Sequence, residues 1–285
     1  MRGPLAAALA LLLAAGCSAR KDPLLERLRG PQVAAHRGGF GFPDSNTVAR
    51  FELTRQLGVE VFETDLRLSK DGVVFLFHNE RLDKVTDCQG RLADRTADEL
   101  SHCHLNGLER GPDRFEDALR WAAGRVVLDA ELKAREAVRP AIDLVAKYGA
   151  WDWVYFQVGS GLRVYQAVRD YDSRVALEAS PRGPRAEEWL AALLAARDSR
   201  LLSIQLHPDF LSDELVGRVH SAGKVASLNA FQLAPETEGA SCTRVFEAGV
   251  DIAVTNAPEP CLKQRDGART THSASVSARR SSASP

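Results

Sequence analysis

The chain has 285 residues, of which 45% are hydrophobic and 7% aromatic, and this composition suits one large domain with a sizeable buried core. Its formal net charge of −1 lacks the basic excess of a nucleic-acid binder. No interior stretch reaches the roughly 18 consecutive apolar residues of a membrane-spanning helix, so a polytopic membrane protein is also excluded.

The N-terminus has the composition of an export signal. It holds one arginine, an apolar run from Pro4 to Ala15, and small residues immediately before Cys17. The ending "AAGC" resembles the lipobox of bacterial lipoproteins, in which the signal is cleaved before a cysteine that is then lipidated; an ordinary cleaved signal peptide is the alternative. We expect a signal over residues 1–16, lipid on Cys17, and a tether over residues 17–30. The protein would then be anchored in the bacterial cell envelope (periplasm or outer membrane), or secreted if it carries no lipid.

Alternating strands and helices are predicted over residues 31–262. Nine apolar runs predict strands: "VAAH", "VFETDL", "VVFLFH", "RVVLDAEL", "WVYFQV", "RVALEA", "LLSIQLH", "KVASLN" and "DIAVTN". Several are separated by helical segments such as "TVARFELTRQLG", "FEDALRWAAG", "AEEWLAALLAA" and "SDELVGRVHSAG". About eight such units predict an α/β fold with a single TIM-type (β/α)8 barrel.

The second and third strand runs are joined only by "SKDG". Such a connection is too short for a parallel crossover and suits a hairpin. One of the two runs is therefore expected to be a small β-hairpin or loop excursion at the C-terminal face of the barrel.

Two carboxylates lie on one side of the second run. Alternate residues of a strand share a face, so Glu63 and Asp65 project together, and they repel each other unless a positive group lies between them. A turn at residues 70–72 would bring His78 back beside Glu63. We interpret this grouping as a functional site; a salt-bridged barrel mouth is the alternative.

Further polar residues end two other predicted strands. His36 is followed by Arg37 and two glycines, a pattern that favours close approach of the backbone to a ligand and offers a guanidinium to a phosphate. Glu131 and Lys133 share a face of a later strand. Barrel enzymes build their sites at the C-terminal ends of strands, so all these groups should meet there. An oxygen-rich pocket suits Mg²⁺ or Ca²⁺, and two histidines outside the metal shell suit general acid–base catalysis.

The remaining cysteines permit two disulfides in an exported chain. The sequence-local pairings are Cys88 with Cys103 and Cys242 with Cys261. Connectivity does not follow from sequence, and free buried thiols are the alternative. The last segment, residues 263–285, is rich in serine and arginine with almost no apolar residue, so it is predicted to be disordered.

The ordered motifs resemble those of the glycerophosphodiester phosphodiesterase family, whose barrel carries "HRG", "PENT", "E-x-D", "KDG", "HD" and "E-x-K". This chain has, in the same order, His36-Arg37-Gly38, Asn46-Thr47, Glu63-Thr64-Asp65, Lys70-Asp71-Gly72, His78-Asn79 and Glu131-Leu132-Lys133. Its "AGVDIAVTNAPEP" is similar to the closing "GVDGIITDYP" of the family. The resemblance covers about residues 32–260.

The resemblance implies metal-dependent hydrolysis of small glycerophosphodiesters to glycerol 3-phosphate and an alcohol. One divalent ion, Mg²⁺ or Ca²⁺, would assist two histidines that act as general acid and base, while two cations contact the phosphate. The residues at the matching positions are Glu63, Asp65 and Glu131 for the metal, His36 and His78 for proton transfer, and Arg37 and Lys133 for the phosphate.

Three positions depart from the family pattern. Ser45, preceded by Asp44, stands at the place of the glutamate in "PENT", while Asn79 and Asn256 replace aspartates. Two alternatives therefore stay open, namely a lyase-type phospholipase D that acts on lysolipids or sphingolipids and a non-catalytic surface lipoprotein that binds phosphodiesters. The "ELK" motif and the closing segment favour the phosphodiesterase. Oligomeric state does not follow from the sequence.

Overall fold

The computed structural model describes residues 22–39, 45–159, 162–233 and 238–267. The predicted signal, Cys17, Asp44 and the tail from residue 268 onward lie outside these ranges. Within the described ranges, no helix combines the length and apolar character needed to cross a bilayer.

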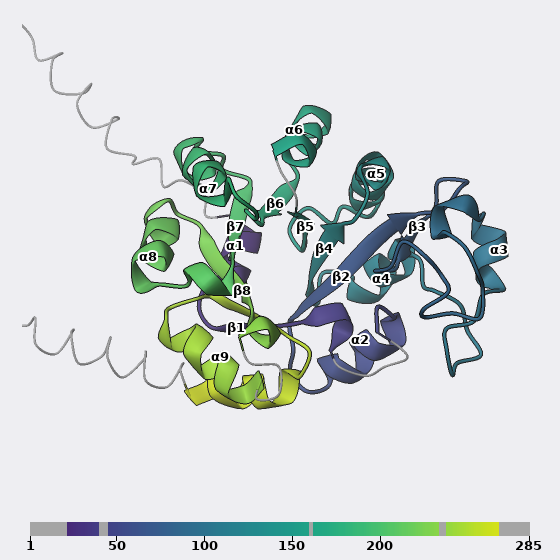
Figure 1. Ribbon diagram of the computed structural model, residues 1–285, viewed down its shortest axis with the longest axis horizontal. Coiled ribbons are helices and arrows are strands. Elements are labelled where there is room, and N and C mark those ends of the chain that lie inside the picture. The colour runs from purple at the N-terminus through teal and green to yellow at the C-terminus, as the bar shows by residue number, and fades with distance from the viewer. Residues whose placement is uncertain (1–21, 40–44, 160–161, 234–237, 268–285) are drawn as a thin grey trace, which may run out of the picture.

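A closed barrel of eight parallel strands forms the centre of the described structure (Figure 1). Neighbouring strands pair in chain order, and β1 pairs with both β2 and β9, which closes the ring. The strands are β1 (Gln32–Ala35), β2 (Val61–Leu68), β4 (Val127–Leu132), β5 (Val154–Val158), β6 (Ala176–Ala179), β7 (Leu201–Leu206), β8 (Val225–Asn229) and β9 (Ile252–Thr255). The predicted TIM-type barrel is confirmed.

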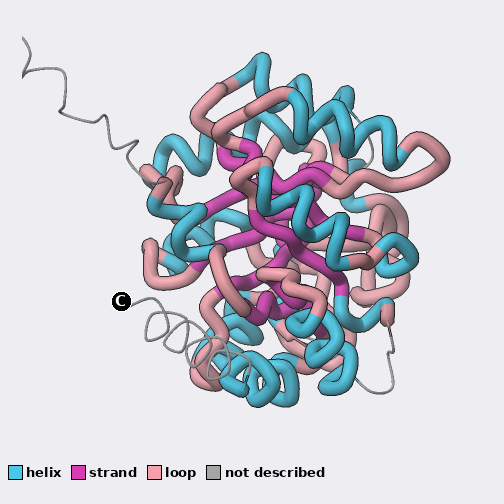
Figure 2. Tube along the Cα trace, turned by 90° about the vertical axis from the view of Figure 1, so that its left-hand side faces the viewer, coloured by secondary structure: helices cyan, strands magenta, loops and turns pink. Residues whose placement is uncertain are grey.

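Helices surround the strands, as both views show (Figures 1 and 2). They are α2 (Val48–Arg55), α4 (Phe115–Ala122), α5 (Val138–Tyr148), α6 (Leu162–Tyr171), α7 (Ala186–Ala195), α8 (Asp213–Ser221) and α9 (Glu238–Glu247). In α4 the buried residues Phe115, Ala118, Leu119 and Ala122 recur at helical spacing, so one face of the helix packs on the barrel. Such packing holds the strand ends, and the polar side chains on them, in fixed positions.

The predicted excursion is β3 (Val74–Leu76), which pairs antiparallel with β2. The chain turns at residues 70–72, where Gly72 has a φ of +85°, a conformation that favours glycine. The segment that follows is larger than the predicted hairpin because it includes η2 (Leu92–Asp94) and α3 (Ala97–Ser101) around a small apolar core of its own.

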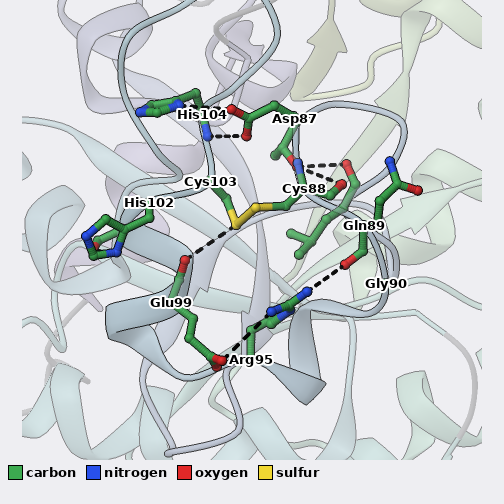
Figure 3. The surroundings of a disulfide bond; sticks show 12 residues. Asp87, Cys88, Gln89, Gly90, Arg95, Glu99, His102, Cys103 and His104 are labelled. Carbon is green, nitrogen blue, oxygen red and sulfur yellow. Dashed lines mark hydrogen bonds and ion pairs between the residues drawn. A yellow bond between two sulfur atoms is a disulfide. The ribbon is translucent and has the colours of Figure 1, made fainter.

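Both sequence-local cysteine pairings form disulfides, so the alternative of free buried thiols does not hold for these four residues. Cys88–Cys103 closes the excursion (Figure 3), and Cys242–Cys261 joins α9 to the helix that follows β9. That last helix runs over residues 258–267, so the domain extends past the predicted boundary at 262 and residues 263–267 are helical.

Helix α1 (Pro23–Leu28) closes the N-terminal end of the barrel, and Figure 1 shows it beside β7. Leu24 and Leu28 are fully buried in an apolar cluster with the first inward-facing residues of the strands, among them Val61 and Val127. The prediction of a tether over residues 17–30 is therefore wrong for this helix. Its two leucines on one face bury apolar area that a free tether would leave in water.

Candidate active site

Three carboxylates converge at the C-terminal end of the barrel. Glu63 and Asp65 lie on β2, and Glu131 lies on β4 directly opposite Asp65 in the parallel register. Each side chain offers one oxygen, and these atoms all lie within 4.8 Å of one another. Strand periodicity predicted that Glu63 and Asp65 share a face, as do Glu131 and Lys133. The pairing of β2 with β4 brings these two sets of side chains together.

Two cations flank Asp65. Lys133 Nζ lies 3.0 Å from Asp65 Oδ1 and 2.6 Å from Glu131 Oε2, while Arg37 Nε lies 3.0 Å from Asp65 Oδ2. Burial alone would raise the pKa of the Asp65 carboxyl, but Lys133 and Arg37 outweigh it and lower that pKa. Asp65 is therefore ionised at neutral pH.

Glu63 lacks comparable neutralisation. Burial, together with the nearby charges of Asp65 and Glu131, raises its pKa well above the ordinary value. When all three carboxylates are ionised, their three negative charges exceed the two positive charges of Arg37 and Lys133 by one. An all-oxygen donor set with uncompensated charge fits a hard divalent cation such as Mg²⁺ or Ca²⁺.

The loop after β1 carries the first histidine into this site. His36 opens η1 (His36–Gly38), and Arg37 has a left-handed φ of 52° that directs its backbone N–H to Glu63 Oε2 at 2.8 Å. Gly38 has a φ of +85°, and a Cβ there would lie 2.5 Å from the ring of Phe51. The glycine after "HR" is thus required for the loop to fold over β2.

His36 is held by Asn256 and Phe231. Its Nδ1 lies 2.6 Å from Asn256 Oδ1, so Nδ1–H donates to the amide oxygen, and its ring stacks on Phe231 with centroids 4.6 Å apart. Nε2 is left without a proton, 3.8 Å from Glu63 Oε2. Burial and then the charge of Arg37 lower the pKa of His36 to about 4, so the imidazole is neutral at pH 7.

The second histidine comes from the excursion. His78 follows β3 beside the end of β2, where the N–H of Phe77 donates to the Asp65 carbonyl at 2.8 Å. Its Nδ1 lies 2.9 Å from Asn79 Oδ1, and with Arg37 and Asn46 it lines a cavity of about 100 Å³. The hairpin thus returns His78 to the rim of the site, as its turn predicted.

Asn46 positions the metal-binding candidate Asp65. It has a left-handed φ of 58°, its Nδ2 donates to Asp65 Oδ2 at 2.8 Å, and its Oδ1 accepts from Thr64 Oγ1 at 2.8 Å. The sequence places Asn46 in the "NT" part of a motif without indicating a role for it, and that place in the motif was the available signal.

A polar layer lies beneath the carboxylates. Asp129 and Glu178 are fully buried, and Glu178 Oε2 accepts hydrogen bonds from Ser203 Oγ and from Ser227 Oγ, the latter at 2.6 Å. Burial raises the pKa of Glu178 to about 7, and burial with the charges of Glu178 and Glu63 raises that of Asp129 well above its usual range. Burial and neighbouring carboxylates therefore disfavour a negative charge on these two side chains.

Comparison with known proteins identifies the family. The model of the glycerophosphoryl diester phosphodiesterase family matches residues 36–260, a stretch that contains every strand end described above except that of β1 itself.

The chain belongs to the glycerophosphoryl diester phosphodiesterase family.

Individual relatives agree with this assignment. Glycerophosphoinositol inositolphosphodiesterase GDPD2 of Mus musculus is 30% identical over 136 residues, which cover 45% of this chain and 25% of that protein. The chain therefore spans only about a quarter of that relative's length. A glycerophosphoryl diester phosphodiesterase from Parabacteroides distasonis has the same fold, with a TM-score of 0.72 and 22% identity over 85% of this chain and 92% of that one.

A phosphodiesterase from Oleispira antarctica also has this fold, with a TM-score of 0.69 and 19% identity. The alignment covers 85% of this chain and 99% of that one, whose structure holds the product sn-glycerol-3-phosphate.

The departures from the motifs of the glycerophosphodiester phosphodiesterase family lie around the two histidines. Asn79 and Asn256 each accept a hydrogen bond from a histidine Nδ1, so both amides keep an acceptor where the motif has an aspartate but carry no charge. Ser45 lines the cavity beside His78, and Asp44 lies outside the described residues. The sequence does not predict the contacts of Asn256 and Phe231 with His36, because closure of the barrel brings these distant residues together.

Proposed function

We propose that this protein is a metal-dependent phosphoric diester hydrolase that converts glycerophosphodiesters to glycerol 3-phosphate and an alcohol. The observation that carries the proposal is the meeting of three carboxylates, two cations and two histidines at the C-terminal mouth of the barrel. Membership of the family and the product bound in the Oleispira relative support this choice of substrate.

Glu63, Asp65 and Glu131 would hold one divalent ion, Mg²⁺ or Ca²⁺. When bound, the ion supplies positive charge that stabilises the phosphoryl oxygens as negative charge grows on them. It would change the excess of one negative charge among the carboxylates and cations into an excess of one positive charge. A phosphodiester carries one negative charge, so the site would then attract its substrate.

Arg37 and Lys133 would contact the non-bridging oxygens of the phosphate. Both already lie beside Asp65, so they are held in place before substrate arrives. Arg37 offers a planar pair of donors and Lys133 a point charge, and both favour the more negative transition state over the ground state.

His36 and His78 would move the protons. His36 Nε2 has no proton and takes one from the attacking oxygen, which is either the neighbouring glycerol hydroxyl or a water. His78, in its protonated form, gives a proton to the leaving alcohol oxygen as the phosphorus–oxygen bond breaks. Attack by the glycerol hydroxyl forms a cyclic phosphate, and the two histidines exchange roles when water opens it.

We also propose that the protein is a lipoprotein, because the "AAGC" ending precedes Cys17. Cys17→Ser should move the protein from the membrane fraction to the soluble fraction of cells that express it. Unchanged partitioning of this variant would disprove the lipid anchor.

The proposed reaction is tested with metal-free protein of residues 18–285. Glycerophosphocholine and glycerophosphoethanolamine are offered with Mg²⁺ or Ca²⁺, and glycerol 3-phosphate is assayed enzymatically. His36→Ala and His78→Ala should each reduce the rate by about 10²- to 10⁴-fold, the range for loss of a general acid or base. His102→Ala is the matched control, because this histidine lies exposed at the end of α3.

Metal-dependent product that disappears in the two site variants would support the hydrolase. A folded protein without product on these diesters but with product on lysolipids would favour the phospholipase D alternative. No product from any diester would favour a binding protein.

A further inference from the structure

The two ends of the barrel differ, because α1 covers the N-terminal end and the candidate site lies at the C-terminal end. Leu24 and Leu28 of α1 pack with Val61 at the N-terminal end, whereas Asp65, four residues further along β2, lies in the candidate site. A strand rises about 3.3 Å per residue, so Asp65 lies about 13 Å above Val61 along the strand. The chain thus enters the domain at the end opposite to the site.

The segment that joins Cys17 to the folded domain is short. Asp22 caps α1, with its carboxylate 3.0 Å from the N–H of Leu24, and it also forms an ion pair with Arg200. Only five residue steps separate Cys17 from Asp22, which is about 18 Å at full extension. A domain of this size has a radius of gyration of about 17 Å and hence a diameter of about 45 Å, so such a segment is too short to reach round to the mouth.

The N-terminal end also presents apolar and aromatic groups. Leu57, in the connection between α2 and β2, is 51% exposed, and Trp151 and Trp153 precede β5 in half-buried positions. Tryptophan is enriched where proteins meet the membrane–water interface. At the mouth, Phe210 of η4 (Pro208–Phe210) is 57% exposed, so the two ends make competing candidates for membrane contact.

We infer that the lipidated protein stands on its anchoring membrane with the N-terminal end of the barrel and turns its catalytic mouth away from that membrane. Its substrates are then water-soluble glycerophosphodiesters without acyl chains, and lipids of the anchoring membrane do not reach the carboxylates. This inference rests on the proposed function and on the proposed lipid at Cys17. The short tether decides between the two ends, because it fixes the entry point of the chain close to the bilayer.

The orientation is tested by energy transfer to labelled lipids. The full lipidated chain is reconstituted in phosphatidylcholine vesicles that contain an acceptor-labelled lipid. A donor dye is attached through p-azidophenylalanine in place of Arg125, an exposed residue before β4 at the N-terminal end, or of Asp209, an exposed residue of η4 at the mouth. This chemistry leaves the disulfides intact.

Transfer from position 125 should exceed transfer from position 209 several-fold. Insertion of about 30 Gly and Ser residues between positions 21 and 22, with an r.m.s. length of about 30 Å, should make the two values similar. Equal or stronger transfer from position 209 in the chain of native length would overturn the inference, because Phe210 would then face the membrane. Energy transfer from both positions that is as low as in the Cys17→Ser variant, which cannot carry the lipid, would also overturn it.

The same vesicles test the substrate class. Glycerophosphocholine in the buffer should yield glycerol 3-phosphate, whereas lysophosphatidylcholine embedded in the bilayer should not be cleaved. Cleavage of the embedded lipid at a rate similar to that of the soluble diester would overturn the substrate inference. If the orientation is as expected but neither compound is cleaved, the proposed function fails and the orientation stands.

Discussion

Asn256 is the single residue whose chemistry bears most directly on His36. Its amide oxygen accepts the Nδ1–H of the imidazole and so selects the tautomer with a free Nε2. An amide does this without adding negative charge to a region that already holds an excess of it. Under the proposed mechanism Asn256 is a positioning residue, whose effect on the rate would pass through His36.

Replacement of Asn256 separates this positioning role from a general effect on the fold. Asn256→Leu removes the acceptor, so we expect kcat to fall by roughly tenfold or more with a smaller change in KM, because the loss of an oriented base acts on the transition state. Asn256→Asp keeps an acceptor and should recover much of the rate. Steady-state kinetics on glycerophosphocholine give both constants, and equal loss in the two variants would contradict the assignment.

Among the elements, α1 has the clearest structural consequence. Its two buried leucines supply the apolar closure of the barrel end, which a tether would not do.

Shortening either leucine should therefore destabilise the domain. We expect Leu24→Ala or Leu28→Ala to reduce the free energy of unfolding by roughly 2–5 kcal/mol, the usual range when a buried leucine leaves a cavity. Leu53→Ala is the matched control, because Leu53 on α2 is 54% exposed and its loss should change stability by about 0.5 kcal/mol or less. Urea unfolding measures both values. Similar stability of all three variants would restore the tether interpretation.

The excursion that carries His78 has a small core and a disulfide to hold it. Cys88 and Cys103 are 15 residues apart, and the hydrogen bonds around them join Asp87 to His104 on the same segment (Figure 3).

Removal of this disulfide should loosen the excursion before the barrel. A cross-link that closes a 15-residue loop contributes about 3 kcal/mol in the chain-entropy model. Paired replacement Cys88→Ser with Cys103→Ser should therefore raise hydrogen exchange within residues 77–105 and lower kcat, with barrel strands such as β5 little changed. Paired replacement of Cys242 and Cys261 is the control and should spare the excursion. Uniform loss of protection in the first variant would contradict a local role.

For the molecule as a whole, a divalent ion at the three carboxylates would link metal binding to stability. Glu63 is buried beside two other acids, so an ion that neutralises them binds the folded state and not the unfolded chain.

Addition of the ion should raise the melting temperature of metal-free protein. At a free ion concentration of 100 times Kd, the stabilisation is about 2.7 kcal/mol. Glu63→Gln and Asp65→Asn should reduce this shift together with metal-dependent activity, whereas Glu188→Gln, on the exposed surface of α7, should leave both unchanged. Differential scanning fluorimetry with Mg²⁺ and with Ca²⁺ gives the shift without reference to catalysis. An identical shift in Glu63→Gln would place the ion elsewhere.

The sequence predicts the strands because a parallel barrel buries each strand on both sides, which leaves continuous apolar runs between helices. All nine runs became strands, and the short "SKDG" connection identified β3 as the strand outside the ring. The sequence left the cysteine connectivity open, and the structure joins the cysteines that are close in sequence, for which the entropy cost of loop closure is small. The role of α1 as a tether was predicted wrongly, because its six residues show charge more clearly than they show which face of the helix is buried.

The sequence by itself determined three things. Alternating strands and helices predicted the fold, and the order of the motifs indicated the family. Strand periodicity predicted the face that bears the carboxylates, because it acts over a few residues. Closure of the ring decided the contacts between residues far apart in sequence. It brought Asn256, which follows β9, and Phe231, which follows β8, against His36, which follows β1, and it placed α1 at the N-terminal end of the barrel. These contacts join residues about 200 positions apart, and no local pattern records which distant side chain will fill the space beside a given one.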